Sequence, residues 1–279
     1  MKKVFLLIIQ VLTFSSLIFS ESLDSITWEK NINWEDNNIE IIIKAPLTQN
    51  NSTLAATRRK AENLITDNKT NIFFKNILDL QINSRETLSE IIDKDPDIYF
   101  KLDRLGESLQ PSNSILSTNL EYMSISYILN LYPDLISVFY TQSQYLKKYK
   151  KLDHRTYGDF TGLIIYVPDN LPLHGKNSTG NLNKVLLPRI FDEDMNLIMD
   201  FTMIEPEFIK KWGVLIYGNS YDENKYLSRI GITPLRIVAR GIFGKNNSDI
   251  IISNSDADKI IGSEDNLKII SQARILILN

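Results

Sequence analysis

The chain contains no cysteine in 279 residues. Disulfide bonds, thiolate metal sites and the lipid anchor of bacterial lipoproteins all need a cysteine, so all three are excluded. A chain without such cross-links must be stabilised by a hydrophobic core. Residues 23–279 are enough to build one large domain or two small ones. The order of apolar patterns along the chain predicts an α+β protein with two modules.

Residues 1–22 have the pattern of an export signal. Lys2 and Lys3 form a basic start, an apolar run follows, and small side chains stand at Ser20 and Ser22. The run falls short of the roughly 20 strongly apolar residues that span a bilayer. We therefore expect cleavage after Ser20 or Ser22, with an uncleaved anchor as the alternative. The mature protein is expected in the periplasm, at the outer-membrane periphery or outside the cell.

Residues 23–132 are predicted to form an N-terminal module in which helices cover one face of a small sheet, in a ββααβ-like order. Apolar and polar residues alternate on both sides of "WEDNN", which indicates a β-hairpin. Ser52 or Thr53 is expected to cap an amphipathic helix, and two shorter helices follow. Apolar residues on both faces of residues 120–129 predict a strand that is covered on two sides.

The strand is preceded by "PSNS" at residues 111–114, which is expected to interrupt the regular structure. Residues 133–157 are predicted to be a helical or irregular connector with a basic end. Residues 158–279 are predicted to form a mixed, β-rich α+β module. Its expected elements are a strand, a long polar loop, a hairpin, two strands around a Gly-Lys-Asn-Asn turn, helices capped near Ser255 and Ser263, and a last strand.

The tightest cluster of carboxylates lies in "PRIFDEDMNLIMD", residues 188–200. Its D-x-D-x-N pattern matches the first three ligand positions of a calcium loop. The match then fails, because Leu197 stands where the loop needs glycine and Met203 where it needs glutamate. Asp and Asn are also common at hairpin tips, since their side chains bond the local backbone. We therefore predict a turn that keeps Asp192 and Asp194 at the surface, and no metal site.

No other motif selects a catalytic site. His154 and His174 are the only histidines, and neither G-x-S-x-G nor H-E-x-x-H occurs. "GIFGKNNS" lacks the spacing of a phosphate-binding loop and is predicted to be a turn. The remaining acidic pairs stand where helices are expected to begin. We predict a protein that is not an enzyme, with no catalytic, cofactor-binding or metal-binding residue and no cofactor.

The formal charge of −3 gives no electrostatic footprint for nucleic acid, so no nucleic-acid partner is expected. One short basic run, "YLKKYKKLDHR", is predicted to be a solvated helix or linker. Its alternative is a peripheral contact with anionic lipid or an acidic partner. Trp34 stands between charged residues at the predicted hairpin tip and is a candidate for exposure. The candidate partner-facing residues are Trp34, Lys147, Lys148, Lys150 and Lys151.

Several segments together resemble a known family. They are "AATRRKAENL" in the first helix and, in the C-terminal half, "TGLIIYV", "LLPRIFDEDMNLI", "PLRIVARGIFGKNNSDIIISNSDADKI" and "RILIL". These segments resemble spirochaete-type envelope proteins that share a small α/β domain with lipoprotein-20-like proteins and with FlgT, a periplasmic flagellar-motor ring protein. The resemblance implies an exported, non-enzymatic protein and carries no catalytic residues. Some relatives are lipoproteins, and the missing cysteine departs from that pattern.

The sequence is compatible with three classes of function. The first is an exported periplasmic structural or protein-interaction component of an assembly such as the flagellar motor or the cell envelope, with other envelope or motor proteins as partners. The second is a secreted or surface-exposed binding protein for a host or cell-wall ligand, which predicts an exposed aromatic patch. The third is a hydrolase with a pocket that holds two of His154, His174 and a carboxylate cluster. The first is favoured, and the oligomeric state is left open.

Overall fold

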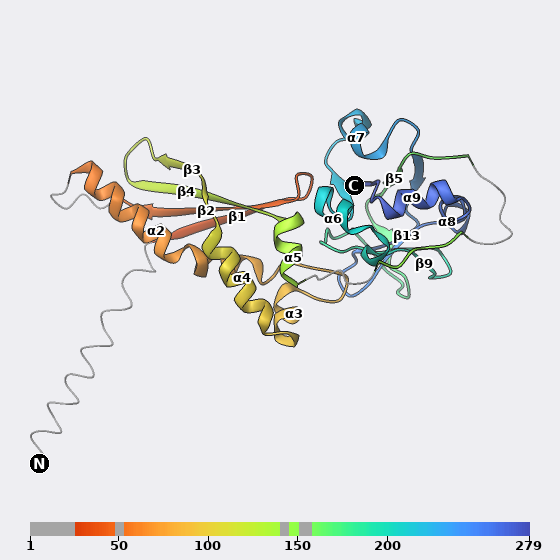
Figure 1. Ribbon diagram of the computed structural model, residues 1–279, viewed down its shortest axis with the longest axis horizontal. Helices are drawn as coiled ribbons and strands as arrows, with labels where there is room; N and C mark the ends of the chain where they lie inside the picture. Colours follow the sequence, from red (N-terminus) through yellow and green to blue (C-terminus); the bar gives the residue numbers. More distant parts are fainter. Residues whose placement is uncertain (1–25, 48–52, 140–144, 151–157) are drawn as a thin grey trace, which may run out of the picture. The chain divides into compact units, whose positions relative to one another are not determined.

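The computed structural model describes residues 26–47, 53–139, 145–150 and 158–279 (Figure 1). Helices and strands mix throughout the described chain, which confirms the predicted α+β class with two modules. The compact units are interleaved along the sequence, so the predicted boundaries at residues 22, 132 and 157 stay predictions. One unit holds the part up to Asn31, Glu40–Phe73 and Gly106–Ile128, and the other holds Ile32–Ile39, Phe74–Leu105 and Leu129–Asn279.

The N-terminal half contains a four-stranded sheet in the order β1-β2-β4-β3. Its strands are β1 (Thr27–Asn33), β2 (Asn38–Pro46), β3 (Pro111–Leu116) and β4 (Tyr122–Asn130). Side chains of β2 alternate between buried and half-buried, because successive residues of a strand point to opposite faces. The predicted hairpin is confirmed, since β1 and β2 are neighbours joined by a turn at residues 34–37.

Helix α2 (Leu54–Ile77) supplies side chains to the core of this half. Ala61 and Ile65 are buried on one of its faces, as the helical spacing predicts. Thr53 caps the helix, because its Oγ1 accepts the N–H of Ala56 at 3.4 Å. The helix runs unbroken through the polar stretch "TDNKTN". Two shorter helices follow, α3 (Leu88–Lys94) and α4 (Asp97–Ser108).

Two predictions for this half are wrong. "PSNS" begins strand β3 instead of interrupting the structure. Four of its six residues are polar or proline and five are exposed, so an edge strand of this kind lacks the alternation that would reveal it. Strand β4 is covered on one face only, because Tyr122 is 40% exposed and Ile128 is 43% exposed on the other.

The connector begins with a π-helical turn, η1 (Leu131–Leu135), and one helical turn, α5 (Ile136–Phe139). Residues 145–150 have no regular secondary structure. Irregular backbone at residues 145–150 agrees with one of the two predicted alternatives, and the connector with its bounds stays a prediction.

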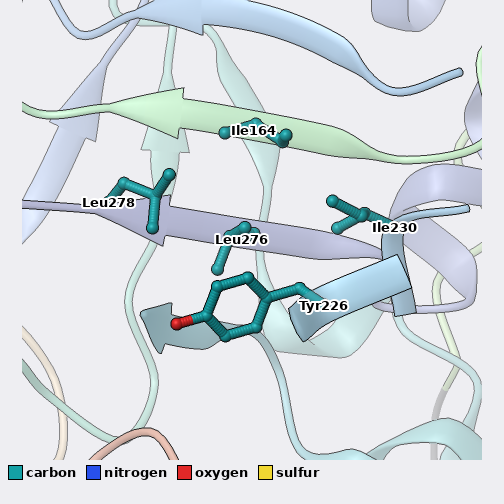
Figure 2. Close-up of a cluster of buried hydrophobic side chains, with 5 residues drawn as sticks. All are labelled: Ile164, Tyr226, Ile230, Leu276 and Leu278. Atoms are coloured by element: carbon teal, nitrogen blue, oxygen red, sulfur yellow. The ribbon is translucent and has the colours of Figure 1, made fainter. Parts of the chain in front are cut away.

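The C-terminal half contains a sheet in which every strand pair is parallel, in the order β10-β14-β5-β11. The strands are β5 (Leu163–Tyr166), β10 (Ile216–Gly218), β11 (Leu235–Val238) and β14 (Ile275–Leu278). Central strands β5 and β14 are continuous apolar runs, which suits a parallel sheet covered on both faces. A buried cluster on one face joins the sheet to the segment that follows β10 (Figure 2). Its members are Ile164, Leu276, Leu278, Tyr226 and Ile230.

A second, mixed sheet has the order β12-β13-β8-β9. Its strands are β8 (Ile190–Phe191), β9 (Leu197–Met199), β12 (Gly241–Phe243) and β13 (Asp249–Ile251). Strands β8 and β13 are parallel, and the outer pairs are antiparallel. A separate short pair is formed by β6 (Leu171–Pro172) and β7 (Thr179–Gly180). The helical segments are η2 (Phe201–Met203), α6 (Pro206–Trp212), η3 (Glu223–Tyr226), α7 (Leu227–Ile230), α8 (Asn254–Ile261) and α9 (Glu264–Ser271).

The C-terminal predictions hold in most details. The hairpin at β8 and β9, the cap at Ser263 and the last strand are confirmed. Helix α8 is capped by Ser253, two residues before Ser255, near which the cap was predicted. The segment "TPLRIVARGIFGKNNSDIIIS" forms three strands in two sheets, where two were predicted. Within the described ranges, no helix has the length and apolar character needed to cross a membrane.

Candidate functional site

The carboxylate cluster of residues 188–200 forms the predicted hairpin tip. Asp192 accepts the backbone N–H of Asn196 at 2.7 Å and its side-chain amide at 2.9 Å. Met195 has φ of 63°, a left-handed conformation that closes the turn. Asp192 is only 7% exposed, so the prediction that it stays at the surface is wrong. The carboxylate can be buried because Asn196 donates a hydrogen bond to each of its two oxygens.

The rest of the tip binds the start of helix α8. Asn254 donates its backbone N–H to Glu193 at 3.1 Å and its side-chain amide to Asp194 at 2.9 Å. Glu193 and Asp194 are exposed, as predicted, and their charges lie near the positive end of the helix dipole. Within the described ranges, no three carboxylate or histidine groups gather as a metal site. The cluster is explained as a turn that fixes a helix start.

Replacing Asp192 with alanine should lower the free energy of unfolding by about 1–3 kcal/mol, because two hydrogen bonds to a buried carboxylate are lost. Asp194→Ala removes one exposed hydrogen bond and should change stability by about 0.5 kcal/mol or less. Urea unfolding of the two variants measures the difference. A calcium-dependent rise in melting temperature that Asp192→Ala abolishes would contradict the turn assignment.

The basic run is only partly within the described residues, since Lys151 and His154 lie outside them. Lys148 donates its ammonium group to the carbonyl oxygen of Leu197 in β9, and burial lowers its pKa while Asp192 opposes that shift. Lys147 and Lys150 are exposed, and the ammonium of Lys147 lies 5.8 Å from the ring of Tyr149. Lys148 is therefore a structural contact, and residues 145–150 follow the linker alternative of the prediction and not the helical one.

Trp34 is half-buried instead of fully exposed. Its ring meets the buried ring of Tyr217 edge to face, with centroids 5.7 Å apart. The hydroxyl of Tyr217 is held in turn by the backbone of Val185 at 3.2 Å. Packing against Tyr217 explains why Trp34 is half-buried. A partner-facing role of Trp34 stays a prediction.

A cavity of about 360 Å³ gathers positive charge from four separate segments of the chain. We call it the basic cavity. Leu173, Ile242 and Phe243 contribute apolar walls, and the β12–β13 turn at residues 244–247 closes one side. Its charged or titratable lining residues are Arg85, His174, Lys176, Arg189 and Lys245.

Arg189 is fixed in the basic cavity by a buried carboxylate. Its Nη2 donates to Oδ2 of Asp249 at 2.6 Å and to Oγ of Ser84 at 2.9 Å. Its backbone N–H also donates to Asp249 at 3.2 Å. Asp249 is fully buried, so the ion pair is shielded from solvent and holds the guanidinium in one orientation.

The other cations around the basic cavity are less constrained. Lys245 pairs with Glu90 at 3.3 Å, and both side chains remain well exposed. Arg85 and Lys176 are exposed, and within the described chain neither side chain has a carboxylate partner. The ring of His174 meets Phe243 edge to face, with centroids 5.8 Å apart. No acidic side chain is among the described residues that line the cavity.

This lining has the charge and polarity to accept an anionic group. An ionised carboxylate or phosphate would meet Arg85, Lys176 and the fixed guanidinium of Arg189, while an attached apolar group could contact Ile242 and Phe243. The hydrolase hypothesis predicts a pocket with at least two of His154, His174 and a carboxylate cluster, and the described lining of the basic cavity holds His174 without a carboxylate. His154, the other histidine of that hypothesis, lies outside the described residues.

Sequence reasoning missed the basic cavity, although it predicted one of its parts. "GIFGKNNS" is the expected turn between two strands, and it places Gly244 and Lys245 at the rim. Gly244 has φ of 100°, and an added Cβ would lie 2.5 Å from Cβ of Ser84. The residues that line the cavity come from segments far apart in the chain, so no local sequence motif predicts it.

The chain is a two-module α+β protein with a surface cavity lined by basic residues. Residues 25–138 match the family model of the N-terminal domain of Treponema pallidum Tp0624, and residues 162–279 match the model of its second domain. Together these ranges cover most of the chain in the same order, so the chain belongs to this spirochaete family. No curated protein matches the chain. The lipoprotein-20-like and FlgT-like resemblance stays a prediction.

Proposed function

We propose that this protein is an exported, non-catalytic interaction component of the spirochaete cell envelope. In this proposal it acts in the periplasm and belongs to an envelope or motor assembly. The export-type pattern of residues 1–22 and the spirochaete family support the proposal. The observation that carries it is the basic cavity, with its fixed Arg189 and two cations, Arg85 and Lys176, that have no carboxylate partner in the described part of the chain.

The basic cavity suits recognition of an acidic segment of a partner protein. Arg189 costs little to order on binding, because Asp249 and Ser84 already hold it. Arg85 and Lys176 add charge that speeds encounter with an acidic surface. Apolar walls beside the charges would allow the partner to bury a neighbouring side chain.

Reversing the charges at Arg85→Glu and Lys176→Glu should weaken partner capture at least tenfold. Both side chains are exposed, so the change should leave stability within about 0.5 kcal/mol. The measurement is cross-linking in intact spirochaete cells, followed by fractionation and quantification of cross-linked partners. Lys101→Glu combined with Lys225→Glu is the matched control, because these exposed lysines lie away from the lining of the cavity.

Loss of capture in the first double variant alone would support the proposal. Equal capture in wild type and both double variants would overturn the role of the basic cavity. Digestion of the protein by protease added to intact cells would instead favour the alternative, a surface-exposed binding protein. The exposed pair Tyr99 and Phe100, with ring centroids 5.9 Å apart, is the aromatic surface that this alternative predicts.

A further inference from the structure

A second surface lies on the N-terminal sheet and shares no residue with the basic cavity. A groove of about 750 Å³ runs between the first half of α2 and the end of β3. The first half of α2 and the whole of β3 belong to one compact unit. The residues that line the groove are Leu54, Ala55, Arg58, Arg59, Glu62, Asn63 and Leu116.

Strand β3 forms one margin of the sheet, as Figure 1 shows. Within the described residues, no strand pairs with its outer side. Ser117 donates its N–H inward to the carbonyl of Tyr122 at 3.0 Å. In an antiparallel ladder, the backbone N–H and C=O groups of successive residues point alternately toward and away from the neighbouring strand. The backbone groups of Ile115 therefore also face β4, and those of Ser114 and Leu116 point outward. Two residues of β3 therefore offer donors and acceptors to an added strand.

The edge is unprotected where it borders the groove. Pro111 and a register shift interrupt only the start of β3. Residues 114–116 carry no charge, whereas the opposite edge strand β1 carries Glu29 and Lys30. The outward N–H of Ser114 is bonded at 2.8 Å only by the neighbouring side chain of Asn113, which a peptide carbonyl could replace.

The groove is lined by both apolar and positively charged side chains, which determine the kind of segment that it can bind. Leu116 lies opposite Met123 in the ladder, so it points to the helix-covered face and lines the groove floor. Leu54 is 43% exposed on the other wall. Arg58 and Arg59 are exposed, and within the described chain neither has a carboxylate partner in an ion pair. Guanidinium groups that have no ion-pair partner among the described residues, placed beside apolar side chains, favour a segment that mixes acidic and apolar residues.

We propose that β3 and α2 bind an extended, acidic segment of a partner protein, which adds to the sheet as a fifth strand. Main-chain bonds to Ser114 and Leu116 would supply affinity, and alternate side chains would enter the groove. Acidic side chains of the segment would bind Arg58 and Arg59. This surface is independent of the basic cavity.

The test titrates the full mature chain with a fluorescein-labelled peptide of sequence Val-Asp-Val-Asp-Val-Asp and follows fluorescence anisotropy. Ser114→Pro removes an outward N–H without removing a bond to β4, and proline is tolerated on edge strands. Arg58→Glu with Arg59→Glu reverses the groove charge. Ile115→Ser is the matched control, because Ile115 is 54% exposed on the opposite face of the sheet.

The expected result is saturable binding that weakens at least tenfold in Ser114→Pro and in the arginine double variant, and less than twofold in Ile115→Ser. A peptide with lysine in place of aspartate should bind at least tenfold more weakly. Absence of binding up to millimolar peptide, or equal binding in all variants, would overturn the proposal. A concentration-dependent dimer that Ser114→Pro abolishes would assign the edge to a second copy instead and would also overturn it.

Discussion

Replacement of Asp249 by alanine is expected to lower the free energy of unfolding by about 3–5 kcal/mol, because the charge of Arg189 then loses its buried counter-ion. Asp249 is fully buried and accepts from the guanidinium and from the backbone N–H of Arg189. Water cannot readily replace a carboxylate at a fully buried position, so the lost interactions are not recovered. Urea unfolding followed by circular dichroism measures the change.

The exposed ion pair of Lys268 with Asp265 is the matched control, since 62% and 58% of its side chains are exposed. Lys268→Ala should cost about 1 kcal/mol or less, as for other surface pairs. Replacing both members of the buried pair, as in Arg189→Met with Asp249→Leu, should recover part of the loss by removing the unpaired charge. A cost of less than about 1 kcal/mol for Asp249→Ala would show that the pair does not anchor the basic cavity.

The elements that sequence reasoning predicted are those with a strong local signal. The hairpins follow from alternating patterns around Asn- and Asp-rich turns, and the cap at Ser263 follows from its acidic first turn. Strand β3 was not predicted because it is an exposed edge strand whose sequence does not alternate between apolar and polar residues. The parallel pairing of β5 with β11 and β14 was not predicted either, because an apolar run in the sequence does not indicate which distant strand it will pair with.

The candidate sites were harder to predict than the fold for the same reason. The carboxylates at residues 192–194 are conspicuous in sequence and prove to be a turn bound to helix α8. The basic cavity is inconspicuous, because Arg85, Lys176 and Arg189 lie in separate segments and meet only through the fold. Lys148 lies in a conspicuous basic run, yet its ammonium group bonds the backbone of β9, and the sequence pattern does not indicate that contact. Charge clusters in space and charge clusters in sequence are different sets here.

Arg229 is the second residue whose replacement should have a large effect, and it lies in the short helix α7. It is 2% exposed and donates to backbone carbonyls, at 2.7 Å to Ala273 and 3.0 Å to Gly213. A third bond goes to Trp212, whose ring also lies under the guanidinium at 5.4 Å. Burial lowers the pKa of Arg229 to about 9, which still leaves it charged at neutral pH.

The carbonyl groups bound by Arg229 lie where two helices end, at the last residues of α6 and just beyond α9. Such groups have no partner within their own helix and carry partial negative charge. One guanidinium can satisfy several of them, because its donors diverge in a rigid plane. Arg229 therefore ties α6 and α9 to α7, under the sheet cluster that Ile230 joins.

Arg229→Met should lower the free energy of unfolding by about 3–5 kcal/mol, since three buried carbonyls lose their donor. Arg229→Lys keeps the charge but offers a single ammonium group, so we expect an intermediate loss of about 1–3 kcal/mol. Arg240→Met is the matched control, because Arg240 is exposed, and should change stability by about 0.5 kcal/mol or less. Urea unfolding gives all three values. If Arg229→Lys proved as stable as wild type, charge alone would account for the contribution of Arg229, and the divergent donors would be dispensable.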